Sequence, residues 1–544
     1  MKRFWKGAAV ALVAIAAIAG TSATSRAAIC GDLNNSGGVN PRSIADVVLL
    51  FRAVLEEPDP SPLCGGAGVL DCGNVISNPS DGGTQIKIND VVALFNSVLG
   101  NETLFELCEG EGNEIACPGG QAVITADVTT NQVWQAGCDI ELGGTVFVTS
   151  GAVVTIRAGA QIQGQRDAAE QPVALIFTPD TKINAVGTSG SPIVFTSDQP
   201  EGSKLPGDWG GLVINGRGPV NCPGDECDAE GLEGVTFGGT QTNDSSGIAR
   251  FIHVEFAGRQ LTIDNELNVF TMNGIGRATT IDHIHAHMGL DDAFEWFGGN
   301  VNTSFMLGTA AADDGLDWQI GTGGAHQFLA YLQYGGNLDP NTSNGWEGDN
   351  NEDDFEADPV SQPHFCNVTV VGAKGQAGGA QPAFGLLGRR GTQFKISHSV
   401  ITNWNTGGVT LRDSATLNDA CNAGPVLTGN TSLSNSVLFG NTADVVNHSS
   451  CDTPGECDCT TTEWFGLQTG NVTGATCNPI DGSSTCNPAT SLCLPTPAAA
   501  CLGSKPANCT SIDASFTNTT YAGAFAPGAG ADWATGAWID LDVD

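Results

Sequence analysis

The sequence predicts a mainly β protein, a right-handed parallel β-helix preceded by a small α-helical module. One observation is a motif that occurs twice, as Asp-Asp-Ala-Phe-Glu-Trp at 291–296 and Asp-Asp-Gly-Leu-Asp-Trp at 313–318. An offset of this size, just over 20 residues, is typical of a solenoid, in which each coil stacks on the previous one. A second observation is a long series of short strand-like segments between glycines, with no helical pattern alternating with them. A β-sandwich is the alternative fold.

The first 27 residues have the features of a secretory signal peptide. Lys2, Arg3 and Lys6 precede a short apolar run over 8–19, and small residues at 25 and 27 form a cleavage site. The run is too short for a membrane anchor, and no other stretch reaches about 20 apolar residues. We therefore predict a protein without a membrane span, secreted to the extracellular space or associated with the cell surface.

The composition restricts the partners that the protein can have. A net charge of −38 over 544 residues argues against nucleic acid and anionic membranes, and it suits a protein surrounded by divalent cations. Solubility alone is an equally good explanation of the charge. All 18 cysteines follow the signal peptide, so disulfide bonds are expected, and the eight cysteines within 451–509 predict stapled, Cys-rich loops.

Residues 28–110 differ from the rest of the chain because they hold two amphipathic helices, predicted over 44–55 and 89–99. The helices share one pattern, so the module is a duplicated loop and helix. The loop before the first helix carries oxygen-bearing side chains at alternate positions, followed by a glycine, as a calcium loop requires. The predicted calcium ligands of this loop are Asp32, Asn34, Ser36 and, displaced along the chain, Asp46.

This module resembles a type I dockerin. The resemblance implies calcium binding and docking to a cohesin-type partner or to the cell surface. The sequence departs from the family pattern at Ser36, where the family has Asp, at an insertion over 41–43, and in a stretched second loop over 71–90. Two interpretations stay open: loops that bind calcium, or a disulfide-tied helical pair that no longer binds metal.

Residues 117–544 are predicted to form the β-helix domain. Strand-like segments lie at 144–164, 174–177, 193–196, 211–215 and 251–256. Other segments have sequence patterns that are characteristic of one protein family: 193–200, 207–216, 291–299, 523–525 and 532–533. They resemble a family of secreted bacterial right-handed parallel β-helix proteins, pectin-lyase-like in fold and of unknown activity. The resemblance implies the fold and an extracellular location, and it supplies no catalytic residues.

Acidic residues recur at the predicted turns, from 264–266 through the duplicated motif to 347–358. Residues one coil apart lie about 4.8 Å apart along the stacking direction, so their carboxylates would repel one another unless water or a cation screened them. Calcium binds roughly six to eight oxygens, whereas Asp and Asn are also ordinary turn formers. The predicted calcium ligands of the β-helix are Asp292, Asp314, Asp317 and Glu356.

A group of histidines predicts a second metal site. His283, His285 and His287 alternate along one strand, so their side chains share one face if the residues between them point inward. An earlier strand adds His253 and Glu255, and such ligands on adjacent strands suit zinc. The alternative is a polar outer face with stacked imidazoles.

A catalytic interpretation combines the acidic turns with a basic residue. In β-helix polysaccharide lyases, calcium neutralises a uronate carboxylate and an Arg or Lys removes the α-proton. The candidates for a lyase or glycosidase site are Asp291, Asp313, Asp354 and Arg389, with Trp296, Trp318 and Trp346 as substrate-binding platforms. Salt bridges between Arg389 and the acids are the alternative.

The sequence therefore predicts a secreted calcium-binding β-helix protein that binds extracellular polysaccharide or acts as a cell-surface or matrix component. A polysaccharide-degrading enzyme is the competing hypothesis, and a purely structural fibre or adhesin is the third. The enzyme hypothesis requires Asp291, Asp313, Asp354 and Arg389 to converge in one open site.

Overall fold

The computed structural model describes residues 113–544. The residues within that range left out of the description are 167–172, 233, 263–264, 342, 377–381, 423, 452–455, 475–479, 482–491, 493, 499–501, 503, 529–532 and 544. The predicted signal peptide and the dockerin-like module, with Asp32, Asn34, Ser36 and Asp46, lie outside the described residues.

A nine-stranded sheet contains one short strand from each successive coil, and every neighbouring pair is parallel. Its strands are β5 (Val146–Val148), β8 (Ala174–Phe177), β11 (Gly211–Asn215), β17 (Phe270–Asn273), β19 (Phe294–Phe297), β21 (Leu316–Gln319), β23 (Trp346–Gly348), β25 (Phe384–Gly388) and β28 (Gly407–Leu411). This stacking confirms a parallel β-helix and rules out the β-sandwich, whose strands run antiparallel.

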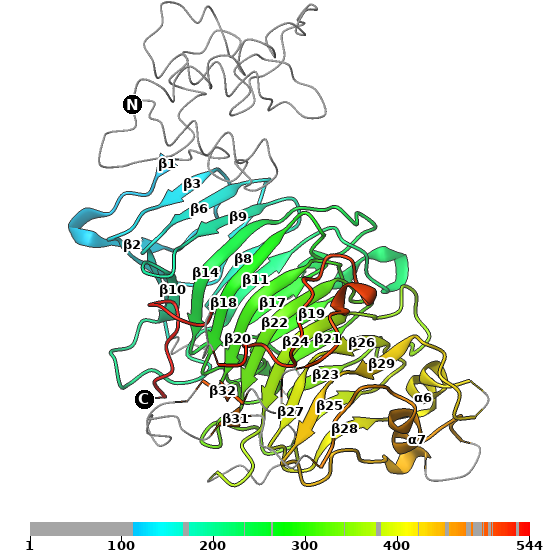
Figure 1. The fold of residues 1–544 in the computed structure, drawn as a ribbon. Helices are drawn as coiled ribbons and strands as arrows, with labels where there is room; N and C mark the ends of the chain where they lie inside the picture. Colours follow the sequence, from blue (N-terminus) through cyan, green and yellow to red (C-terminus); the bar gives the residue numbers. More distant parts are fainter. Residues whose placement is uncertain are drawn as a thin grey trace, which may run out of the picture. The chain divides into compact units, whose positions relative to one another are not determined.

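A seventeen-stranded sheet covers the remaining faces of the coils (Figure 1). The early coils contribute two strands each, among them β1 (Asn113–Glu114), β2 (Gln121–Ile124), β3 (Gln132–Trp134), β4 (Asp139–Leu142), β6 (Val153–Arg157), β7 (Gln161–Gly164), β9 (Lys182–Val186) and β10 (Ile193–Ser197). The middle coils have one long strand: β14 (Gly247–Glu255), β18 (Thr280–His287), β20 (Thr303–Thr309), β22 (Ala325–Leu332) and β24 (His364–Val371). The last coils return to two, β26 (Phe394–Ser397) with β27 (Val400–Thr402) and β29 (Thr431–Ser434) with β30 (Val437–Phe439).

Each long strand bends at one residue with positive φ, so one strand serves two faces of its coil. Strand β14 pairs with β9 before the bend at Phe251 and with β10 after it. The rings of Phe251 and of the bend residues in the next coils stack on one another in order, with successive centroids 4.3, 4.7 and 5.1 Å apart: Phe251, His283, Phe305 and Phe328. Positive φ is unfavourable for such residues, and the stacked rings offset that cost.

The interior of the coils is filled by aliphatic and aromatic side chains. Residues alternate in and out along each strand, so Phe294 and Trp296 point into the core while Glu295 between them points outward. The largest fully buried side chains of the main core include Trp134, Trp209, Trp296, Trp318, Trp346, Trp404 and Trp464.

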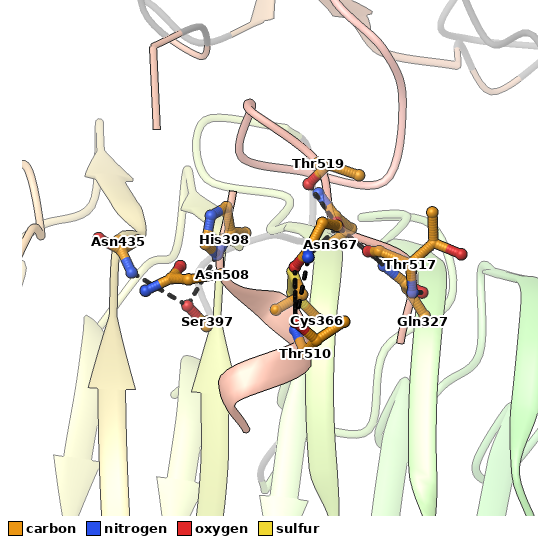
Figure 2. Close-up of a disulfide and its surroundings, with 12 residues drawn as sticks. Gln327, Cys366, Asn367, Ser397, His398, Asn435, Asn508, Thr510, Thr517 and Thr519 are labelled. Atoms are coloured by element: carbon orange, nitrogen blue, oxygen red, sulfur yellow. Dashed lines mark hydrogen bonds between the residues drawn. A yellow bond between two sulfur atoms is a disulfide. The ribbon is translucent and has the colours of Figure 1, made fainter. Parts of the chain in front are cut away.

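A C-terminal segment, residues 505–528 and 533–543, runs back over the bends of the long strands (Figure 1). Figure 2 shows Gln327, Asn367 and His398 reaching it beside the disulfide between Cys366 and Cys509. Gln327 exchanges hydrogen bonds with the backbone of Thr517 at 2.7 and 2.8 Å. Side chains of the strands form hydrogen bonds with the backbone of this segment. The segment is therefore part of the fold, even though its described residues add no strand to the large sheet.

Five disulfides lie in the described part of the chain and confirm the expected disulfide bonding. They join Cys117 to Cys138, Cys222 to Cys227, Cys366 to Cys509, Cys421 to Cys459, and Cys451 to Cys457. Small elements complete the fold: helices α6 (Ser414–Ala420) and α7 (Thr461–Gly466), and the antiparallel pairs β12 (Cys227–Asp228) with β13 (Thr236–Phe237), β15 (Gln260–Thr262) with β16 (Asn265–Glu266), and β31 (Ile480–Asp481) with β32 (Thr496–Pro497). Among the described helices, none has the length and apolar character that a membrane crossing requires.

Candidate functional site

A column of acidic side chains runs along the outer face of the nine-stranded sheet. Glu295, Asp317 and Glu347 are in register on the adjacent strands β19, β21 and β23, with Thr271 of β17 one coil before them. The two glutamates are only 4% and 6% exposed. Three carboxylates therefore occupy neighbouring, largely buried positions one strand spacing apart.

A second column lies in the turns that lead into these strands. Asp292 accepts a hydrogen bond from the backbone N–H of Asp314 at 2.7 Å, and Asp314 accepts one from the backbone N–H of Asn344. Asn344 in turn accepts from the backbone N–H of Phe384 at 2.9 Å. Each turn side chain thus fixes the position of the next coil, which accounts for the recurrence of Asp and Asn here.

The two columns meet in three overlapping groups of carboxylates. Within each group, one oxygen from every member lies within 4.8 Å of the others. The groups are Asp291 with Asp292 and Asp313, Asp292 with Glu295 and Asp317, and Asp314 with Asp317 and Glu347. The structure therefore brings together Asp291, Asp313 and the predicted ligands Asp292, Asp314 and Asp317.

These carboxyl groups do not readily hold negative charge without compensation. Burial, reinforced by the neighbouring acids, raises the pKa of Asp314 and that of Glu347 to about 8. The pKa of Asp317 is raised well above its ordinary value, first by burial and then by Glu295 and Glu347. A loop residue, Glu230, adds a further carboxyl group whose pKa burial raises to about 8.

Several oxygens of the cluster lack a hydrogen-bond partner. Oδ1 of Asp313, Oδ1 of Asp317 and Oγ1 of Thr271 are buried and unpaired among the described residues. Thr271 is 3% exposed and lies beside Glu295 in the register. Buried oxygens without a donor are costly, and a set made only of oxygens is what a hard divalent cation such as calcium requires. The residues therefore fit such a cation.

Two arginines close one end of the cluster. Arg389 forms ion pairs with Glu347 and with Asp349, the latter at 2.8 Å, and Arg390 reaches Asp349 at 2.7 Å and Glu352 at 3.5 Å. Despite burial, these carboxylates raise the pKa of Arg389 above its already high ordinary value. The guanidinium of Arg389 is therefore held in the protonated form.

Comparison with protein families shows which family shares this architecture. Residues 126–479 match the model of the pectate-lyase-like β-helix domain. The chain belongs to this family. No curated protein and no solved structure gave a significant match. Membership of the pectate-lyase-like β-helix family fits a polysaccharide-related role, and together with the disulfides it is consistent with an extracellular protein.

Two predicted site residues of this pectate-lyase-like β-helix do not join the cluster. Asp354 and Glu356 are exposed and lie in one turn, where Asp354 accepts from the backbone N–H of Glu356 at 3.1 Å. The backbone N–H of Asp354 donates to Asn351 in the same turn. Among the described residues, no hydrogen bond or ion pair joins Asp354 to Asp291, Asp313 or Arg389.

The prediction of an aromatic platform is wrong. Trp296, Trp318 and Trp346 are 0–1% exposed and lie inside the coils. Each of them neighbours an outward-facing acid in its strand, and adjacent residues of a strand point to opposite faces. These tryptophans therefore stabilise the core and cannot contact a polysaccharide.

Two of the predicted zinc ligands, His285 and His287, form hydrogen bonds with the C-terminal segment. His285 Nδ1 accepts from the backbone N–H of Asp540 at 3.3 Å, and His287 Nε2 donates to the carbonyl of Asp542 at 2.7 Å. Thr309 Oγ1 joins their other ring nitrogens at 2.8 and 2.7 Å. Since all four ring nitrogens are engaged, neither imidazole has a free lone pair for a metal.

His253 packs against the rings of His285 and His287, with centroids 4.6 and 6.1 Å away, which matches the alternative interpretation of stacked imidazoles. His253 lies 3.3 Å from Glu255, which also accepts from Lys204 at 3.0 Å. His283 lies in the stack of bend residues, 2.7 Å from Asp282. The structure therefore brings His253, His285 and His287 together beside Glu255, whereas His283 belongs to a different stack.

Sequence reasoning missed Asn268 and Thr271 as members of the site. The signal was present, because Asn268-Val-Phe-Thr271 has the pattern of Asp292-Ala-Phe-Glu295 and of Asp314-Gly-Leu-Asp317. Asn268 donates from Nδ2 to Oε2 of Glu295, which places it in the turn column. Reading Asn and Thr as equivalents of Asp and Glu would have extended the motif by one coil.

Proposed function

We propose that this protein is a calcium-dependent binder of acidic extracellular polysaccharide. The observation that carries the proposal is the pair of buried, unpaired oxygens, Oδ1 of Asp313 and Oδ1 of Asp317, within a cluster of carboxylates. Asp291, Asp292, Asp313, Glu295 and Asp317 would hold the cation.

A bound calcium ion supplies positive charge that attracts carboxylate groups of an acidic polymer. The turn residues position that charge, because Asp292 and Asp314 are tied to the following coils by backbone hydrogen bonds. Asp291, Asp313 and Asp317 are only partly buried, so solvent reaches the cluster at these residues. A ligand would approach from there.

Binding is favoured over degradation by the state of Arg389. A general base must be able to lose a proton, whereas the contacts of Arg389 with Glu347 and Asp349 keep it protonated. Asp354, the remaining member of the hypothetical catalytic set, is confined to its own turn.

The experiment is a calcium titration of chelator-treated protein by calorimetry, followed by binding assays with polygalacturonate and with neutral dextran. We expect calcium to bind and polygalacturonate to bind only in its presence, with no new reducing or unsaturated ends. Absence of calcium binding would overturn the proposal, and release of such ends would replace binding with degradation.

Matched variants locate the site. Asp317→Asn removes one charge from the centre of the cluster, and we expect calcium affinity to fall by about tenfold or more. Asp139→Asn removes one exposed carboxylate from β4 in the other sheet and should bind calcium as the unaltered protein does. Equal affinities of the two variants would place the calcium site elsewhere.

A further inference from the structure

A disulfide and a histidine meet where the C-terminal segment crosses the coils (Figure 2). Cys366 lies in β24, and its partner Cys509 begins the short helical turn η6 (Cys509–Ser511) of the C-terminal segment. His398 directly follows β26 and is the bend residue of the next coil, with positive φ. Both sulfurs and one ring nitrogen of His398 lie within 4.8 Å of one another. Two strands and the C-terminal segment thus bring a Cys₂His set together.

This set lies in an apolar environment. Cys366, Cys509 and His398 are fully buried, and the two cysteines pack with Ala325 and Phe516. While the disulfide exists, the sulfurs carry no charge and need no counterion. Reduction changes this, because a thiolate in apolar surroundings is costly unless a cation neutralises it.

His398 has the hydrogen bonds of a metal ligand. Its Nε2 donates to the carbonyl of Pro506 at 2.7 Å, since a carbonyl can only accept. The neutral ring therefore has its lone pair on Nδ1, which accepts from Oγ of Ser397 at 2.8 Å. Burial lowers the pKa of His398, and so does the charge of Lys505, which keeps the ring neutral at neutral pH. A donor bond from the second nitrogen to a backbone carbonyl is typical of histidines that bind metals.

An oxygen next to the set in the sequence also lacks a partner. Oδ1 of Asn508, the residue directly before Cys509, is buried and accepts no hydrogen bond among the described residues. Structural zinc sites have a tetrahedral set of ligands, mostly sulfur and imidazole nitrogen. Two thiolates and one imidazole supply most of such a set, and water or the oxygen of Asn508 can complete it.

We infer that the reduced protein binds zinc through Cys366, Cys509 and His398. A dithiol reductant opens the site by thiol–disulfide exchange: the protein S–S bond breaks, an S–S bond forms in the reductant, and two hydrogens pass to the protein sulfurs. Zinc then displaces both thiol protons and binds the thiolates. Because the ligands are buried, the metal enters when the C-terminal segment folds onto the coils, as metal binding and folding are coupled in such sites.

The disulfide and the zinc ion are therefore alternative cross-links between the C-terminal segment and the coils. The disulfide holds the segment in oxidising surroundings, and zinc holds it where thiols stay reduced. Zinc binding by these residues does not depend on the proposed function, which concerns the other sheet.

The test uses cobalt(II), whose thiolate complexes absorb in the near-UV, as a probe for zinc. Full-length protein is reduced with a dithiol in urea, freed of the dithiol without air, and refolded with cobalt. We compare His398→Gln, which keeps a donor for the carbonyl of Pro506, with the control His364→Gln. His364 also contacts the C-terminal segment, through Asp513 at 3.1 Å, but lies outside the Cys₂His set.

We expect His398→Gln to bind about one cobalt ion fewer per chain than the unaltered protein, with a matching loss of thiolate absorption. His364→Gln should bind as the unaltered protein does, and zinc should displace the cobalt. Absence of cobalt binding by the refolded reduced protein would overturn the inference. Equal stoichiometry in the unaltered protein and His398→Gln would also overturn it, because the metal would then lie at other cysteines. An equal loss in both variants would assign the effect to the packing of the segment and overturn it too.

Reduction opens the other disulfides as well, so a second variant decides the case in which the reduced chain does not refold. Cys509→His removes the disulfide with Cys366 while the others stay closed, and it replaces the thiolate by an imidazole. We expect Cys509→His to bind cobalt without reductant, and Cys509→Ser, which lacks the third ligand, to bind none. Equal cobalt binding by these two variants, or none by either, would overturn the inference.

Discussion

Asp317 lies beside Glu295 on the next coil, in register across the parallel strands β21 and β19. Two buried carboxyl groups at one strand spacing repel each other when both are ionised, and Glu347 continues the series on the following coil. The stability of the cation-free protein should therefore depend on pH.

We predict that chelator-treated protein loses stability as the pH rises. The pKa of Asp314 is raised to about 8 in the fold, whereas unfolded carboxyl groups titrate near pH 4. Between these values the folded state retains protons that the unfolded state releases, so stability is lost as pH increases. We expect the melting temperature to fall by about 4 °C or more from pH 5 to pH 8.

Two controls accompany this measurement. Saturating calcium should reduce the decrease, because a cation on the adjoining carboxylates favours the ionised form of Asp314. Asp314→Asn should reduce it, since the amide retains an oxygen for the backbone N–H of Asn344 but does not titrate. A melting temperature that rises between pH 5 and pH 8 in chelator would contradict the burial of ionisable acids here.

Asp292 should have two separable roles. Its Oδ1 accepts the buried backbone N–H of Asp314, and its charge contributes to the cation site. Asp292→Asn keeps an acceptor and should weaken calcium binding with little loss of stability in chelator. Asp292→Ala leaves the N–H unpaired, which should cost an additional 1–3 kcal/mol or so of unfolding free energy. Urea denaturation in chelator compares the two variants, and equal stabilities would argue against the structural role of the hydrogen bond.

The coil period could be predicted from the duplicated motif because identical residue types recur where identical turns stack. The inward orientation of the Trp296 and Trp318 side chains could also be predicted from the sequence, since each residue directly follows an outward-facing acid in its strand. Other contacts leave no local signal. His285 meets Asp540 across 255 residues, and Glu230 approaches the cluster from a separate loop. Such long-range contacts depend on packing that no spacing rule encodes.

Trp318 should affect stability and leave ligand binding unchanged. Its side chain is fully buried, and its Nε1 donates to Thr392 at 2.9 Å. Trp318→Ala should destabilise the protein by about 3–5 kcal/mol because it opens a cavity. Trp318→Phe should be milder and should keep normal polygalacturonate affinity. A folded Trp318→Phe variant that no longer binds would show that this residue contacts the ligand after all.

The C-terminal segment should detach when Trp538 is removed. This side chain is fully buried and lies edge-on to the rings of Phe251 and His283, with centroids 5.9 and 5.5 Å away. Trp538→Ala should expose the segment to proteases while the coils stay intact. Limited proteolysis with mass spectrometry should detect cleavage after Cys509, and cleavage within the strands instead would indicate global unfolding.

Acid should weaken the same attachment through His287. Burial lowers the pKa of His287 to about 4, whereas an unfolded histidine titrates near 6.5. Below pH 6.5 the unfolded state therefore binds the proton first, and stability is lost as the pH falls toward 4. One pKa unit corresponds to about 1.4 kcal/mol, so the unfolding free energy lost through His287 by pH 4 is about 3 kcal/mol. Saturating calcium reduces the opposing effect of the acids during the measurement.

His287→Gln provides the comparison for the acid effect. Glutamine can still donate to the carbonyl of Asp542, but it does not titrate, so the stability of the variant should change less between pH 6.5 and pH 4. Other buried histidines, among them His326 with a pKa lowered to about 3, contribute equally to the acid sensitivity of both proteins. Urea midpoints at both pH values give the difference. Parallel decreases in the two proteins would assign the acid sensitivity to those histidines and remove His287 from the explanation.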